Sequence, residues 1–405
     1  MKFLSLRILL LLSSMPLLSQ AQETVTVMAY NLLNYEGIQA DSALRNPYFR
    51  KIMQEVKPDL LVCEEIVVYS AIQGFVANVM NDSADIYSLG AFITGFDTNK
   101  ALIYRNEKFT FISNKAIKTD LRDINEFTVI HKASGDTLRL YAVHLKASSS
   151  ASDEAQRALE VDSLRKRTNA LPAGSDFIVC GDFNIYSSNE TPYQKLMQDN
   201  ATDDGNFNDP LPVSGNFNTS ANAKYHTQSP RVRSFGGGVT GGMDDRFDMI
   251  LFSNAIMEAG GISYVPGSTV PYGNDGNHYN DSINRPPNTA VSMEIANALH
   301  QASDHIPIIA KLQFEVTGDE PIVSQQTAVS VFPNPFNEEV TFAFSPLPSS
   351  DIEFFLTDIV GRVVERQQFH ASAKLILQLS SLKDGIYFYH LKIKGQVLQG
   401  KIARQ

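Results

Sequence analysis

Short apolar runs that end in polar clusters recur along residues 22–315. The runs are Thr24–Ala29, Leu60–Cys63, Leu138–Val143, Phe177–Cys180, Phe247–Phe252 and Ile306–Leu312. Runs of this length without helical spacing are typical of buried strands. Polar strand ends in α/β proteins tend to meet at one rim of a sheet, where sites are placed. The pattern therefore predicts one large α/β domain with a site at such a rim.

The last part of the chain, residues 329–405, has a different pattern. Apolar residues alternate with polar or small ones in two places, at Val340, Phe342 and Phe344 and again at Leu375, Leu377 and Leu379. This spacing of two, with no helical pattern nearby, predicts a small all-β sandwich. Residues 316–328 lose the periodicity and gain polar and turn residues, so we expect a linker there.

The first 21 residues have the pattern of an export signal. Lys2 and Arg7 are followed by the apolar run Ile8–Leu12, and Ser19-Gln20-Ala21 has the small-x-small form of a cleavage site. The apolar run is too short and too interrupted to span a bilayer comfortably. We expect a signal peptide over residues 1–21 and no transmembrane segment in the mature chain.

Composition and charge narrow the class of protein. The 405 residues include two cysteines and no tryptophan, which excludes a disulfide-rich mini-protein and a cysteine-rich zinc module. Residues 22–315 contain 24 basic and 35 acidic residues, a net charge of −11. A domain this acidic is not one that coats nucleic acid non-specifically, although it can still bind a phosphate at one local site.

The polar clusters together contain the parts of a metal-assisted phosphate site. They are Asn31, Glu64-Glu65, His144-Leu145-Lys146, Gly181-Asp182-Phe183-Asn184, Asp248 and Ser303-Asp304-His305. Each one alone also fits an ordinary turn, helix start or solvated loop. Together they supply hard oxygen ligands, two imidazoles and a carboxylate that can orient one imidazole.

The same residues carry a resemblance to a known family. Met28-Ala29-Tyr30-Asn31, Pro58 to Glu65, His144-Leu145-Lys146, Gly181-Asp182-Phe183-Asn184, Arg246-Phe247-Asp248 and Ser303-Asp304-His305 resemble, in order, the motifs of the endonuclease/exonuclease/phosphatase superfamily. The resemblance implies a four-layer αββα sandwich with the site at one rim of the paired sheets. One position departs from the family pattern, because Glu64 stands where the family usually has Gln.

The resemblance also implies a role for each site residue. Glu65 would be the principal ligand of Mg²⁺ or Mn²⁺, with Asn31 and Asp304 contributing. His305 would be the general base that activates water, held in the right tautomer by Asp248. The remaining three positions are those that would hold the water and the phosphate or help the leaving group, namely Asp182, Asn184 and His144. A hard divalent ion and a histidine base suit phosphodiester hydrolysis near neutral pH.

Two basic residues and the two cysteines carry weaker indications. Arg105, which follows the strand-like Ala101–Tyr104, and Lys146, two residues past His144, are candidates for contacts to substrate phosphate, although either also fits a solvated strand end. Cys63 and Cys180 each precede an expected site carboxylate by two residues, so we expect each thiol to share a face with that carboxylate. The sequence leaves open whether they are two buried thiols or a disulfide.

The C-terminal region carries a second resemblance. Val331 to Phe336, Asp358 to Arg362 and Leu382 to Tyr387 resemble the C-terminal sorting domain of the type IX secretion system. The resemblance implies export through the outer membrane and the secretion machinery as a partner. The alternative is a carbohydrate-binding or adhesion sandwich, which the absence of tryptophan makes less favourable.

The sequence therefore predicts a secreted or cell-surface phosphodiester hydrolase that depends on a divalent metal, most consistent with a monomeric nuclease acting on extracellular nucleic acid. One alternative is a phosphatase or phospholipase-like phosphodiesterase that acts on inositol phosphates or phospholipids. Another is a surface binding protein that keeps the fold without catalysis.

Overall fold

The computed structural model describes residues 21–37, 41–200, 203–234, 236–316, 328–345, 347–348, 351–393 and 396–405. The chain divides into two compact units, Met1–Thr317 and Gly318–Gln405. The expected signal peptide, except Ala21, and most of the expected linker lie outside the described residues. Within those residues, no helix is both long and apolar enough to cross a membrane.

Two sheets form the centre of the first unit. One has the strand order β10 (Ile262–Tyr264), β12 (Ile308–Val316), β1 (Ala21–Tyr35), β2 (Leu60–Ile66), β4 (Asn99–Arg105) and β3 (Tyr87–Leu89), with β11 (Val270–Pro271) paired to β12. The other has the order β5 (Phe109–Ile117), β6 (Ile124–His131), β7 (Thr137–His144), β8 (Phe177–Asp182) and β9 (Asp248–Phe252). Strands β1 and β2 are parallel, as are β7 and β8, whereas β12 and β9 run antiparallel to their neighbours.

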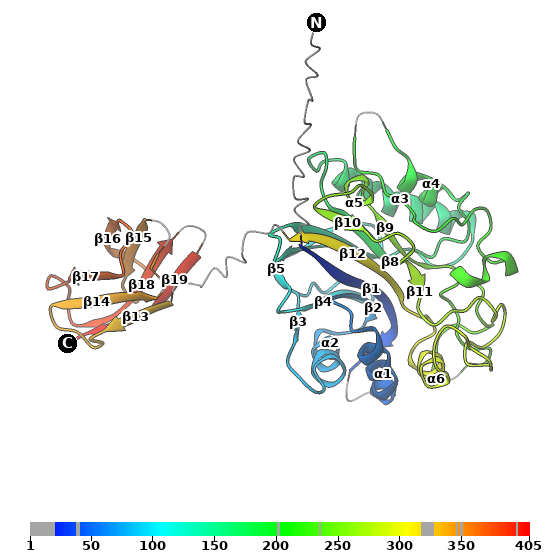
Figure 1. Cartoon of the computed structure of the whole chain (residues 1–405), viewed down its shortest axis with the longest axis horizontal. Helices are drawn as coiled ribbons and strands as arrows, with labels where there is room; N and C mark the ends of the chain where they lie inside the picture. Colours follow the sequence, from blue (N-terminus) through cyan, green and yellow to red (C-terminus); the bar gives the residue numbers. More distant parts are fainter. Residues whose placement is uncertain are drawn as a thin grey trace, which may run out of the picture. The chain divides into compact units, whose positions relative to one another are not determined.

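Helices cover the outer faces of this pair of sheets. They are α1 (Asn46–Val56), α2 (Tyr69–Phe75), α3 (Ala151–Thr168), α4 (Thr191–Met197), α5 (Asn254–Met257) and α6 (Met293–Ala302), with the short turns η1 (Asp41–Arg45), η2 (Val76–Met80) and η3 (Ser220–Tyr225). Figure 1 shows α1 and α2 on one side of the sheets and α3 and α4 on the other. This arrangement confirms the predicted four-layer αββα sandwich.

Strand β1 shows how the sequence produces these layers. Val25, Val27 and Ala29 pack in the core between the two sheets, whereas Met28 and Tyr30 pack in the core beneath the helices. Successive side chains of a strand point to opposite faces, so a strand buried on both faces reads as one continuous apolar run. The apolar runs of the sequence are continuous for this reason.

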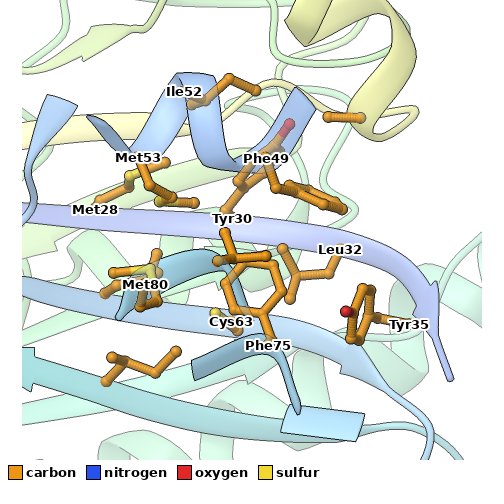
Figure 2. Close-up of a cluster of buried hydrophobic side chains, with 14 of the residues drawn as sticks. Met28, Tyr30, Leu32, Tyr35, Phe49, Ile52, Met53, Cys63, Phe75 and Met80 are labelled. Carbon is orange, nitrogen blue, oxygen red and sulfur yellow. The ribbon is translucent and has the colours of Figure 1, made fainter. Parts of the chain in front are cut away.

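The core beneath α1, α2 and α6 is rich in aromatic rings. Figure 2 shows Tyr30, Tyr35, Phe49 and Phe75 close together in this core. Their rings meet edge to face, with centroids 5.6 Å apart for Tyr30–Phe49 and 5.4 Å apart for Phe49–Phe75. Edge-to-face pairs of this kind fix the position of α1 against the sheet.

The second unit is an all-β sandwich, as predicted. One sheet has the order β13 (Ala328–Phe332), β14 (Glu339–Ser345) and β17 (Lys374–Gln378), and the other has the order β16 (Val363–Phe369), β15 (Ile352–Thr357), β18 (Gly385–Ile393) and β19 (Gln396–Arg404). The alternating residues of β14 and β17 face its core. Phe342 meets Phe354 of the opposite sheet with ring centroids 5.4 Å apart.

The two cysteines are buried free thiols in different sheets. Cys63 lies on β2 and faces the helical layer, whereas Cys180 lies on β8 and faces the space between the sheets. Cys180 shares its face with Asp182, as expected. The expectation that Cys63 shares a face with Glu65 is wrong, because a bulge in β2 interrupts the alternation between them.

The inter-sheet core generates a stability prediction. Leu140 of β7 is fully buried there, so Leu140→Ala should lower the free energy of unfolding by about 2–5 kcal/mol, measured by chemical denaturation of the full chain. Leu44, 74% exposed, is the matched control, and Leu44→Ala should change it by less than about 0.5 kcal/mol. Similar losses in both variants would contradict the inter-sheet position of Leu140.

Candidate active site

The alternation that builds the inter-sheet core also builds the site. Where the apolar run of a central strand ends, the next residue on the inter-sheet face is polar. These residues are Asn31 on β1, Glu64 on β2, His144 on β7 and Asp182 on β8. Asp248 opens β9 opposite Asp182, and His305 comes shortly before β12, which pairs antiparallel with β1. Six strands from two sheets therefore bring polar side chains to one rim.

Glu65 reaches this rim through a local departure from strand geometry. Its φ of +57° lies in the left-handed region, and the pairing of β2 with both neighbours shifts register there. The bulge turns Glu65 away from the helical face on which simple alternation would place it. Asn31 Nδ2 donates to Glu65 Oε1 at 2.9 Å, and the backbone N–H of Asn34 donates to Oε2 at 2.9 Å. Both carboxylate oxygens are therefore fixed.

Asn31 orients the two carboxylates on either side of it. Its Nδ2 also donates to Asp182 Oδ2 at 3.3 Å, and its Oδ1 accepts from the backbone N–H of Leu33 at 2.9 Å. The side-chain oxygen of Asn31 is thus used within β1. In this arrangement the amide presents its nitrogen to the carboxylates, and the expected role of Asn31 as a metal ligand stays a prediction.

His305 and Asp248 form a buried pair that links the two sheets. His305 Nδ1 lies 2.7 Å from Asp248 Oδ2, and His305 Nε2 lies 3.8 Å from Asp182 Oδ2. Gln228 Nε2 lies 2.7 Å from the same ring nitrogen, a contact that no pattern in the sequence predicts. Burial opposes the charged imidazolium, but Asp248, Asp182 and Asp304 together raise the pKa of His305 well above its ordinary value.

His144 faces the same space from β7. Its Nε2 lies 3.7 Å from Asp182 Oδ2 and 3.9 Å from Glu65 Oε1. Its Nδ1 has no hydrogen-bond partner in the described part of the chain. Burial, with Arg122, Lys100 and His305 nearby, lowers the pKa of His144 well below its ordinary value. The ring is therefore neutral and can act as a ligand or as a hydrogen-bond donor.

Asn184 shapes the loop that follows β8. Its φ is +51°, which asparagine tolerates better than most residues. Its backbone N–H donates to Asp182 Oδ1 at 3.0 Å, and its Nδ2 donates to the carbonyl of Leu145 at 3.2 Å. Asn184 thus joins the ends of β7 and β8 and holds the Asp182 carboxylate.

The donor atoms at this rim fit a divalent cation. Glu65 Oε1, His144 Nε2 and Asp182 Oδ2 offer ligand atoms that lie within 4.8 Å of one another. Burial, and then the neighbouring carboxylates Asp248 and Glu65 against the opposing His305, raise the pKa of Asp182 to about 7. Burial therefore disfavours the charged form of Asp182, and a cation bound beside it would favour that form.

Asp304 lies against a glycine-rich loop. Its Oδ2 accepts a hydrogen bond from the backbone N–H of Val239 at 2.7 Å. A Cβ atom on Gly238, whose φ is +83°, would lie 2.7 Å from the same oxygen. The carboxylate therefore positions the loop beside His305 and does not belong to the group of three metal-ligand candidates.

Neither basic residue expected to contact substrate lies free at this rim. Strand β4 runs antiparallel to β2, so Arg105 at its end lies beside Asp59, before β2 begins, with Arg105 Nε 3.4 Å from Asp59 Oδ1. This is the opposite rim of the sheet. Lys146 lies beyond the end of β7, where strand alternation no longer applies, and its Nζ is 2.8 Å from Asp153 Oδ1. The structure therefore does not bring Arg105 to the site, whereas a substrate contact by Lys146 stays a prediction.

Two charged residues to which the sequence analysis gave no role, Glu64 and Lys100, lie at the rim. Glu64 is fully buried, and neither of its carboxylate oxygens has a hydrogen-bond partner among the described residues. Burial, followed by Asp248 and Asp182, raises its pKa well above the ordinary value. Gly181 leaves room for it, since a Cβ there would lie 2.7 Å from Glu64 Oε1. Lys100, 3% exposed, faces the same space from β4.

Comparison with solved structures finds chains of low sequence identity. The structure of D. rerio TDP2 with a single-strand DNA product is 13% identical, with 71% of this chain and 98% of that chain covered and a TM-score of 0.48. The human Nocturnin catalytic domain with bound sulfate is 16% identical (73% and 97% covered, TM-score 0.46). An endonuclease/exonuclease/phosphatase family protein from Bacteroides thetaiotaomicron is 15% identical, with 73% of this chain and 99% of that chain covered and a TM-score of 0.45. No curated protein sequence matches the chain.

Family models match both units of the chain. Residues 330–405 match the secretion system C-terminal sorting domain, which marks the protein as one exported to the cell surface or the medium. Residues 28–305 match the endonuclease/exonuclease/phosphatase family, and this stretch runs from the start of the Asn31 motif to His305. The chain belongs to the endonuclease/exonuclease/phosphatase family.

Proposed function

We propose that the protein is a divalent-metal-dependent phosphodiester hydrolase that cleaves nucleic acid outside the cell. One observation carries the proposal: Glu65, His144 and Asp182 offer their ligand atoms within 4.8 Å of one another, and the buried His305–Asp248 pair faces the same carboxylate. A binding protein that had lost catalysis would have no use for this combination.

Glu65, His144 and Asp182 would hold Mg²⁺ or Mn²⁺. When bound, the ion would stabilise the negative charge that develops on the phosphate oxygens. Carboxylate oxygens favour these ions, although one imidazole in the set is also compatible with other divalent metals. The fit rests on the donor atoms and on the raised pKa of Asp182, because a bound cation would favour the charged form that burial disfavours.

His305 is placed to take a proton from the attacking water. Asp248 holds Nδ1, which leaves Nε2 directed toward Asp182, with Gln228 Nε2 beside it. The carboxylate of Asp248 also stabilises the imidazolium that forms. The carboxylates that raise the pKa of His305 include Asp182. A bound cation would compensate the charge of Asp182 and so lower the pKa of His305, which would leave more of the ring neutral and able to take a proton from water near neutral pH.

The activity itself is the first test. Full-length protein should cleave plasmid DNA or RNA in the presence of Mg²⁺ and should lose this activity with EDTA. Bis-p-nitrophenyl phosphate and an inositol phosphate are assayed beside the polymers. Release of inorganic phosphate with both polymers intact would instead favour the phosphatase alternative, and no turnover on any substrate would favour the binding protein.

Metal binding can be measured without catalysis. Glu65→Ala should weaken binding of Mn²⁺, measured by isothermal titration calorimetry, by at least about tenfold, because ligand substitutions remove a direct bond that outweighs the 10- to 100-fold effect of outer partners. Glu258→Ala changes an exposed carboxylate outside the site and should bind as the wild type does. Equal affinity in the two variants would remove Glu65 from the metal site.

If His305 transfers a proton and does not bind the metal, its substitution should lower turnover but not metal affinity. His305→Ala should lower turnover by about 10²- to 10⁴-fold, the usual contribution of a general base, while Mn²⁺ affinity stays within a few fold of wild type. Asp248→Asn should lower turnover in the same direction, because it removes the charge that stabilises the imidazolium. Near-normal turnover in both variants would be incompatible with the mechanism.

A further inference from the structure

Lys100 is the cationic side chain that the fold directs into the space between the sheets at the active rim. Strand β4 is antiparallel to β2, with Ala101 opposite Cys63 and Asn99 opposite Ile66, so its first residues lie beside Glu64 and Glu65. Leu102 and Tyr104 face the inter-sheet core, and alternation places Lys100 on the same face. Lys100 therefore approaches the site from the side of β4.

The charge of Lys100 is not matched by a close partner. Its ammonium makes no hydrogen bond and no ion pair within 4.0 Å to any described residue, although only 3% of the residue is exposed to solvent. Burial, followed by the positive charge of Arg122, lowers the pKa of Lys100 to about 8. The carboxylates of Glu64, Asp123 and Glu160 oppose this lowering without forming an ion pair with Lys100, so a phosphate placed beside Lys100 and Arg122 would meet two cations.

Arg122 is held in place by two contacts, which show where the cationic region formed by Lys100 and Arg122 lies. Its Nη2 lies 2.7 Å from Asp97 Oδ2, and its Nη1 donates to the carbonyl of Leu145 at 3.4 Å. Leu145 follows His144, so Arg122 lies on the His144 side of the rim, and β4, which carries Lys100, contacts β7, which carries His144. Both cations are among the charges that lower the pKa of His144, after burial.

We propose that Lys100 binds a phosphate of the substrate that flanks the scissile phosphate on the His144 side. This inference rests on the proposed function, because it assumes a substrate chain with more than one phosphate. The scissile phosphate is accounted for by Glu65, Asp182 and His305, whereas Lys100 lies with Arg122 beyond them. A substrate of this kind is a nucleic acid strand and not an isolated phosphodiester.

Glu64 offers a competing explanation that an experiment can separate. Its buried carboxylate is near enough to Lys100 to raise the pKa of the ammonium, so Lys100 could serve only to balance it. If that were its only role, removing both charges would restore function, because Gln at position 64 is the usual residue in the family that this chain resembles. The double variant Glu64→Gln/Lys100→Met therefore tests the balance directly.

The experiment measures binding of a fluorescein-labelled single-stranded oligonucleotide to the full-length protein in EDTA, by anisotropy, across a series of salt concentrations. Lys100→Met should weaken binding by about tenfold and lower the slope of log affinity against log salt by about one, the loss expected for one phosphate contact. Lys195→Met is the matched control, because Lys195 on α4 pairs with Asp162 at the surface. The control should leave the slope unchanged.

Turnover in Mg²⁺ adds a second readout. Lys100→Met should lower kcat/KM about tenfold on an oligonucleotide and less than twofold on bis-p-nitrophenyl phosphate, which has no flanking phosphate. The double variant should behave as Lys100→Met does. Recovery of binding in the double variant, an unchanged salt slope, or equal losses on both substrates would each overturn the assignment of Lys100. If the wild type neither binds nor cleaves any oligonucleotide, the proposed nuclease function fails first and the assignment fails with it.

Discussion

The active rim depends on the face-to-face packing of two sheets. Two of its hydrogen bonds cross from one sheet to the other: Asn31 to Asp182 at 3.3 Å, and His305 to Asp248 at 2.7 Å. Neither sheet alone contains both a base and its orienting carboxylate. The apolar core between the sheets therefore acts as more than a source of stability, because it sets the distance at which these polar groups meet.

This packing concentrates negative charge in a place that water reaches poorly. Glu64, Asp182 and Asp248 are each at most 2% exposed, and Glu65 lies beside them. Burying a carboxylate is unfavourable, and the raised pKa values of Glu64 and Asp182 record that cost. The fold tolerates them because the large apolar cores on both sides of each sheet hold the strands in place. A cation bound at the rim would offset part of this repulsion, so metal binding and the stability of the folded state should be linked.

Much of this site could be predicted from the sequence because strand alternation is regular. The polar ends of the apolar runs did identify Asn31, His144, Asp182, Asp248 and His305 as neighbours. The prediction failed where local geometry departs from the regular strand. Glu65 is turned by a bulge, which no simple pattern reveals, and the same bulge separates it from the face of Cys63.

Strand direction and loop contacts caused the other differences. Arg105 was assigned to the site because it ends an apolar run, but an antiparallel strand carries its last residue to the opposite rim and its first residue, near Lys100, to the site. Knowing the direction of β4 would have exchanged one residue for the other. Gln228 lies in an irregular segment, so only the folded structure brings it to His305. The pattern of residues thus predicts which strands carry site residues. The pairing of the strands decides which end of each strand lies at the site.

The negative net charge of the domain affects how nucleic acid, a polyanion, would approach and bind the site. With a net charge of −11 over residues 22–315, the surface on average repels nucleic acid, and electrostatic steering cannot speed the encounter. Charges are screened over about 8 Å at physiological ionic strength, so this repulsion matters mainly at close approach. Local attraction must then come from the bound cation and from the few cations at the rim, of which Lys100 lacks a close carboxylate partner. An enzyme built in this way discriminates by the fit of phosphates to one small cationic region, and its affinity should depend on divalent ions in the medium more than on its overall charge.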